Sequence, residues 1–331
     1  MRDLIQDYYS DCFKADMPAA FRTIKNAGRL RDKKAEALRR KVLARFIERT
    51  ETERIRCDDN FVRSVIKAYR SYYQQAFLQR DRLPALSKGL SAALKTAARR
   101  QGISSLTTAS GKKFEENLKK EVKRRGFFSL LGCVAPFRSL LVWRREYPRT
   151  FKVKLPETTQ NVKVVFLKQI IELGWLHYAT FGRYHVGGWA EKTAIFCVKQ
   201  AYKTGSRNFK VNYLSHEAQH FADYKMFPKL KTIDLEYRAK LVQLAFTDDA
   251  KTYLKRLENE AKNDPQSPHS FAAYKILQHF KTQASKDKIS ARAVQLLCKH
   301  TAALRQAGAK KVKSILVGKV ALPAKEAMGN Q

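Results

Sequence analysis

The chain has 331 residues, of which 44% are hydrophobic, so it can bury a sizeable core and is long enough for two domains. Lysine and arginine outnumber aspartate and glutamate by 66 to 30, which gives a formal net charge of +36. The cysteines are scattered singly, which favours reduced thiols and argues against a disulfide framework and a cysteine metal site: Cys12, Cys57, Cys133, Cys197 and Cys298.

The positive charge is spread along the whole chain. Residues 1–150 carry 35 basic and 16 acidic side chains, and residues 151–331 carry 31 and 14. A dedicated nucleic-acid arm would concentrate the charge, and no zinc-finger spacing, glycine-rich phosphate loop or RNA-binding aromatic signature occurs. The charge therefore leaves two interpretations open, a basic solvated surface and weak electrostatic binding to nucleic acid.

Helical patterns dominate residues 1–128. Apolar side chains recur there at steps of three and four residues, which predicts a broad amphipathic face made of Phe61, Val62, Val65, Ile66, Tyr69, Tyr72, Tyr73, Ala76 and Phe77. We expect this aromatic stripe to serve packing rather than nucleobase stacking. The first region is predicted to be a basic, mostly α-helical domain.

One apolar segment, residues 126–143, requires a test for a membrane span. Arg138, Pro136 and two glycines interrupt it, and a central arginine costs about 3 kcal/mol on insertion scales. We therefore predict buried core at a domain junction and no membrane span. The first residues, 1–7, are already charged and do not resemble a secretory signal, so a cytoplasmic location is expected.

Strand patterns occupy residues 150–200. Residues 151–155 alternate apolar and polar side chains, and residues 162–167 and 194–198 are apolar and rich in β-branched types. Between them, residues 187–190 read as a tight turn or as a close approach of the backbone to a substrate. Because strands follow helices and precede helices, the sequence predicts an α+β fold.

The most informative motif is His216-Glu217-Ala218-Gln219-His220. On a helix, residues four apart lie on one face, so both imidazoles can reach a single zinc ion while Glu217 lies beside the open coordination position. No glycine or proline interrupts residues 210–225, so one helix is expected to span about that range and to end before Pro228.

A catalytic zinc needs a third protein ligand. Asp223 lies on the same helix face with a short side chain, whereas Glu236 belongs to the following predicted helix and approaches from another direction. We favour Glu236 as the ligand and Asp223 as a neighbouring residue that orients an imidazole N–H or organises the end of the helix. A surface ion pair between Glu236 and Lys240, four residues apart, is the alternative.

With His216, Glu217, His220 and Glu236, and the strand-like residues 193–198 upstream, the sequence resembles the gluzincins, the thermolysin-like zinc metallopeptidases. The resemblance covers about residues 160–245. It implies that His216, His220 and Glu236 bind Zn²⁺ and that Glu217 is the general base. The separation of His220 and Glu236 is shorter than in thermolysin.

An amide hydrolase also needs a donor that stabilises the oxyanion. The candidates are His269, which we favour because it occupies a polar, proline-marked stretch, and His185, Tyr184 and Tyr237. Sequence alone does not rank the last three.

The expected organisation has three parts. Residues 1–128 form the helical region, 129–306 a zincin-like catalytic domain with a small mixed sheet, and 307–331 a basic, partly flexible tail. Helices are predicted at 235–246, 250–262, 271–282 and 291–306.

The predicted function is hydrolysis of peptide or protein substrates. A basic nucleic-acid-associated protein with a structural or vestigial zinc site, and a zinc hydrolase of a non-peptide amide, stay open as alternatives, and the sequence does not specify oligomeric state.

Overall fold

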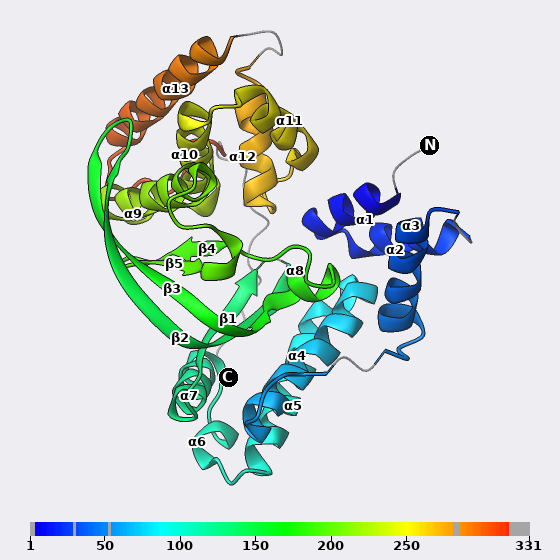
Figure 1. Cartoon of the computed structure of the whole chain (residues 1–331). Helices are drawn as coiled ribbons and strands as arrows, with labels where there is room; N and C mark the ends of the chain where they lie inside the picture. The colour runs from blue at the N-terminus through cyan, green and yellow to red at the C-terminus, as the bar shows by residue number, and fades with distance from the viewer. Residues whose placement is uncertain (1–3, 29–30, 52–53, 135, 281–284, 318–331) are drawn as a thin grey trace. The chain divides into compact units, whose positions relative to one another are not determined.

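The computed structural model describes residues 4–28, 31–51, 54–134, 136–280 and 285–317 (Figure 1). Contacts divide the chain into two compact units. Unit 1 comprises Met1–Pro148, Val165–Gly187 and Cys197–Ala201, and unit 2 comprises Arg149–Val164, Gly188–Phe196 and Tyr202–Gln331. Each unit is therefore assembled from stretches that are separate in the sequence. Residues 318–331 of the expected basic tail lie outside the described residues.

Unit 1 is mainly helical. The predicted aromatic face lies on α4, where all nine expected residues are buried, and Tyr73 of this face accepts a hydrogen bond from the backbone of Leu140. The stripe thus packs the core, as predicted. The helices of unit 1 are α1 (Leu4–Phe13), α2 (Met17–Asn26), α3 (Lys33–Val42), η1 (Leu43–Ile47), α4 (Asn60–Leu78), η2 (Arg80–Arg82), α5 (Leu83–Arg99), α6 (Ser104–Thr107), α7 (Gly111–Arg124), α8 (Gly174–Ala179) and η3 (Lys199–Ala201).

One sheet has the strand order β1-β2-β3-β5-β4. Its strands are β1 (Phe128–Val134), β2 (Phe137–Lys154), β3 (Thr159–Leu173), β4 (Gly188–Ala190) and β5 (Ile195–Val198). The apolar segment 126–143 supplies β1 and the start of β2, which pair antiparallel from Phe128 opposite Trp143 to Val134 opposite Phe137. Within the described residues, no helix has the length and apolar character needed to cross a membrane. The fold is α+β, as predicted.

Unit 2 is organised around one buried helix. Its helices are η4 (Phe209–Ser215), α9 (His216–Met226), α10 (Thr232–Phe246), α11 (Ala250–Glu260), α12 (Pro268–Leu277) and α13 (Lys286–Gln306). Helix α10 contacts α9, α12 and α13 and is buried from Ile233 to Leu244 on all sides (Figure 1). A helix buried in this way cannot leave its polar side chains unpaired, so those of α10 make the specific contacts of unit 2.

The motif helix begins with a π-helical segment. In η4 the hydroxyl of Ser215 donates to the carbonyl of Lys210, five residues earlier, at 2.8 Å. Helix α9 then runs from His216 to Met226, two residues before Pro228. The predicted helix over 210–225 is therefore present, but its first part, η4, is π-helical rather than α-helical. π-Helical turns are rare and occur frequently at functional sites.

Two local expectations were wrong. Residues 187–190 are not a turn, because Gly188–Ala190 forms β4. A Cβ on Gly188 would lie 2.2 Å from the carbonyl oxygen of Phe196, so glycine is required by the close approach of β5. His269 does not lie in a loop either, because Pro268 begins α12 and places His269 in its first turn.

Candidate metal site

The side chains of His216, His220 and Glu236 converge in unit 2. The Nε2 atoms of the two histidines lie 3.1 Å apart. Glu236 reaches them from α10, with Oε2 at 3.6 Å from Nε2 of His216 and Oε1 at 3.3 Å from Nε2 of His220. Within the described residues, these three side chains form a group whose ligand atoms all lie within 4.8 Å of one another. The structure thus brings together the three residues expected to bind zinc.

The polar atoms of this group suit a cation. Glu236 is 5% exposed, and its two carboxylate oxygens face the nitrogens of His216, His220 and His269 rather than water. Two imidazole nitrogens that face each other at 3.1 Å repel unless a proton or a metal ion lies between them. Two imidazoles and one carboxylate are the donor set of a catalytic zinc site. The residues present therefore fit Zn²⁺.

Gln243 determines which nitrogen of His216 faces the group. Its Nε2 donates to the backbone carbonyl of Asn212 at 2.9 Å, so its Oε1 faces Nδ1 of His216 at 3.0 Å. The hydroxyl of Tyr253 donates to the same Oε1 at 2.7 Å. His216 consequently carries its proton on Nδ1 and presents the lone pair of Nε2 to Glu236 and His220.

Burial and neighbouring charges separate the protonation of the two histidines. Burial, with the nearby His220, lowers the pKa of His216 to about 3. Burial also opposes charge on His220, but the carboxylate of Glu236 raises the pKa of His220 to about 9. Burial opposes ionisation of Glu236, yet His269 and His220 hold its pKa well below the usual range. The carboxylate of Glu236 therefore favours positive charge on His220, whereas burial disfavours it on His216.

Glu217 is buried next to this group. It is 8% exposed, and burial raises its pKa to about 7, against the opposing influence of His220. A carboxylate whose pKa lies near neutrality both accepts and returns a proton readily. Glu217 can therefore exchange a proton near neutral pH.

His269 adjoins the group without belonging to it. Its Nδ1 lies 2.9 Å from Oε2 of Glu236, and 63% of its side chain is exposed. The carboxylate of Glu236 raises the pKa of His269. The ring is thus held by Glu236 on one side and faces solvent on the other.

The remaining oxyanion candidates have other surroundings. His185 and Tyr184 belong to unit 1, where Tyr184 packs against Tyr9 and His185 contacts the carbonyl of Val186. Tyr237 packs against the ring of His300 at 5.0 Å between centroids.

Within the part of the chain that the structure describes, Asp223 does not pair with an imidazole, and Lys240 does not pair with Glu236, although the sequence had suggested each of these pairs. Both oxygens of Asp223 lie 2.9 Å from Nε of Arg238, and Asp223 does not orient an imidazole among the described residues. Lys240 pairs with Glu260 at 2.8 Å rather than with Glu236. Glu236 is therefore not part of a surface ion pair with Lys240, because its partners are His216, His220 and His269.

Sequence reasoning did not identify Gln243, Tyr253 or Tyr224. Gln243 and Tyr253 act through His216, as described above. Burial raises the pKa of Tyr224, and Glu217 is the largest charge that adds to this effect. Tyr224 follows Glu217 by two helical turns, so the helical spacing could have indicated it. No sequence signal pointed to Gln243, because its contact depends on the packing of α10 against α9.

Comparison with known proteins gives no relative for this chain. No family model matches it, and no curated protein and no solved structure is similar to it at a significant level.

Proposed function

We propose that this protein is a zinc-dependent metallopeptidase with His216, His220 and Glu236 as metal ligands and Glu217 as general base. The supporting observation is the convergence of three ligand atoms from α9 and α10 within 4.8 Å. Among the described residues, this group supplies three protein ligands, which is the number that leaves a coordination position for water. A structural site would be expected to supply four.

The chemistry follows from the surroundings of each residue. A bound Zn²⁺ would polarise the scissile carbonyl and lower the pKa of water toward about 7. Glu217 accepts the proton of the attacking water and delivers it to the leaving amine. Burial of Glu217 raises its pKa toward neutrality, which strengthens its carboxylate as a proton acceptor.

His269 supplies the remaining donor in this proposal. Glu236 holds Nδ1 of His269, so Nε2 remains for a substrate oxygen on the exposed side of the ring. A hydrogen bond there stabilises the negative charge that develops on the carbonyl oxygen. His269 is therefore a catalytic residue, and Gln243 and Tyr253 are positioning residues that act through His216.

The edge of the sheet favours a peptide over a compact amide substrate. Strand β4 is the last strand in the sheet order and contacts α9. An extended peptide that pairs with such an edge presents its backbone in a regular register beside the helix that carries the ligands. Trp189 of β4 stacks on Phe196 at 5.0 Å and stiffens this edge.

The deciding experiment measures metal content and hydrolysis together. Wild type, His216→Ala, Glu236→Ala and Glu217→Gln are purified without a metal-affinity tag, and zinc per chain is determined by plasma emission spectroscopy. We expect one zinc in wild type and in Glu217→Gln, and none in the two ligand variants. Hydrolysis of a peptide library should occur only with wild type. A wild type without zinc after reconstitution, or an active Glu217→Gln enzyme, overturns the proposal.

A further inference from the structure

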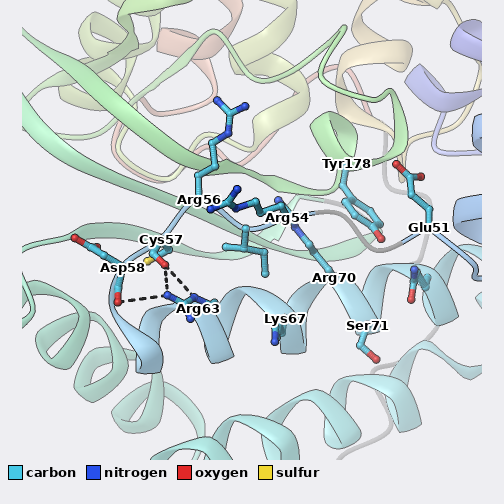
Figure 2. A pocket seen from close by; sticks show the side chains of 12 residues that line it. Glu51, Arg54, Arg56, Cys57, Asp58, Arg63, Lys67, Arg70, Ser71 and Tyr178 are labelled. Carbon is cyan, nitrogen blue, oxygen red and sulfur yellow. Dashed lines mark hydrogen bonds between the residues drawn. The ribbon is translucent and has the colours of Figure 1, made fainter.

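A cavity in unit 1 collects basic side chains that the metal site does not use. Its volume is about 1180 Å³, and the segment that precedes α4, the helix α4 itself and Tyr178 of α8 line it (Figure 2). The lining includes five basic side chains, Arg54, Arg56, Arg63, Lys67 and Arg70, and two acidic ones. Basic side chains therefore outnumber acidic ones around this cavity.

The two acidic side chains of the lining are neutralised from outside it. Both oxygens of Glu51 accept hydrogen bonds from Arg45 at 2.9 Å. Asp58 pairs with Arg144. Neither Arg45 nor Arg144 lines the cavity. The carboxylates of Glu51 and Asp58 are therefore paired with arginines outside the lining and not with the lining cations.

Four of the five lining cations have no carboxylate partner among the residues that the structure describes. The exception is Arg70, which pairs with Glu172 at 2.8 Å. Arg63 donates to the backbone carbonyl of Cys57 at 2.9 and 2.6 Å, which are bonds to neutral acceptors. Arg54, Arg56 and Lys67 are exposed, and no carboxylate among the described residues pairs with them. The cavity is therefore a concentrated positive site.

The walls of the cavity are fixed by the fold. The bonds from Arg63 tie the segment before α4 to the first turn of that helix, as the dashed lines in Figure 2 show. The ring of Tyr178 is buried, with the guanidinium of Arg45 4.8 Å from its centroid. Ser71 adds an exposed hydroxyl from α4.

We propose that this cavity binds a phosphate-bearing anion. Guanidinium groups match the oxygens of a phosphate and are weakly hydrated, so they suit this ligand better than an isolated carboxylate. The volume exceeds that of a single ion and accommodates several phosphate groups. The phosphates belong either to a small molecule, such as a polyphosphate, or to the backbone of a single-stranded nucleic acid. The site shares no residue with the metal group and does not depend on the proposed peptidase function.

The test compares two double variants of the full chain. Arg54→Gln/Lys67→Gln removes two exposed lining cations, whereas Lys88→Gln/Arg99→Gln removes two exposed cations from α5 that do not line the cavity. Binding is measured by fluorescence anisotropy with a labelled single-stranded oligothymidine of about ten nucleotides. Sodium pyrophosphate is titrated by calorimetry. Circular dichroism verifies that both variants are folded.

We expect the lining variant to bind at least tenfold more weakly than wild type and the α5 variant to lie within about threefold of wild type. The lining variant lacks two phosphate contacts. For the oligonucleotide, the plot of the logarithm of the association constant against the logarithm of the salt concentration should therefore be less steep by about 1.4. Pyrophosphate binding identifies the small-molecule source, and oligonucleotide binding alone identifies the backbone source. Equal losses in the two variants, or no binding of either probe by wild type, overturn the proposal.

Discussion

The side-chain oxygen of Gln243 lies 3.0 Å from Nδ1 of His216 and fixes the orientation of that imidazole ring. The same oxygen accepts a hydrogen bond from Tyr253, and the amide nitrogen of Gln243 is used by the carbonyl of Asn212. Because all polar atoms of this amide are engaged, it cannot turn over and present its nitrogen to His216. The arrangement defines the tautomer that a metal ligand needs.

Replacement of Gln243 tests this relationship. Gln243→Leu keeps a buried apolar side chain but removes the acceptor, so we expect zinc affinity to fall about 10- to 100-fold. Competition with a chromophoric chelator at constant pH measures the change. Tyr253→Phe, which removes only the second hydrogen bond to Gln243, should have a smaller effect. An unchanged affinity in Gln243→Leu, with lower thermal stability, would show that the residue serves packing alone.

Sequence patterns anticipated the elements that depend on local chemistry. The spacing of His216 and His220 on one helix face and the aromatic face of α4 are consequences of helical periodicity, and both are present. A ligand from a second helix approaches from another direction, which favours Glu236, and the structure brings Glu236 to the two histidines.

Features that depend on packing between distant segments could not be predicted. Gln243 lies near His216 only because α10 packs against α9. Likewise, the sequence does not show whether Asp223 pairs with a histidine or with Arg238, because that depends on how α10 packs against α9. By contrast, Pro268 lies in the first turn of α12, a position where proline is common, so the local sequence was compatible with the helix that contains His269.

His269 is expected to affect turnover without affecting metal content. His269→Ala removes the proposed oxyanion donor, so kcat should fall by about 10²- to 10³-fold while one zinc per chain is retained. Steady-state kinetics on a peptide substrate and plasma emission spectroscopy measure the two quantities. His279→Ala, in an exposed position after α12, is the matched control and should behave as wild type. Loss of zinc from His269→Ala would instead make His269 a residue that holds Glu236.

The pair of Asp223 and Arg238 connects α9 to α10 and is predicted to dominate the stability of unit 2. Both side chains are 0% exposed, and Arg238 also donates to Thr301 at 2.7 Å. Asp223→Ala leaves a buried guanidinium without its closest counterion, which should cost about 3–5 kcal/mol of unfolding free energy.

Urea denaturation measures the cost of Asp223→Ala. The control is Asp248→Asn, which breaks the pair with Arg207, whose side chains are 59% and 63% exposed. Because water screens that pair, the control should change stability by less than about 1 kcal/mol. Similar costs in the two variants would contradict the assignment of a structural role to Asp223.

His177 of unit 1 is predicted to make the protein sensitive to mild acid. Burial, with the nearby His185, lowers the pKa of His177 to about 4, whereas its unfolded value is 6.5. Between these values the unfolded chain binds a proton that the folded chain does not. Stability is therefore unaffected by His177 above pH 6.5 and decreases as pH falls toward 4.

The variant His177→Gln replaces the titratable imidazole with a side chain that binds no proton in this pH range. Unfolding free energies of wild type and variant are compared at about pH 7 and about pH 4, so that the contributions of all other groups cancel in the difference. Between the two pH values wild type should lose on the order of 2 kcal/mol more than the variant, because the ring is only partly buried. Equal losses would mean that His177 is protonated in the folded protein as easily as in the unfolded chain.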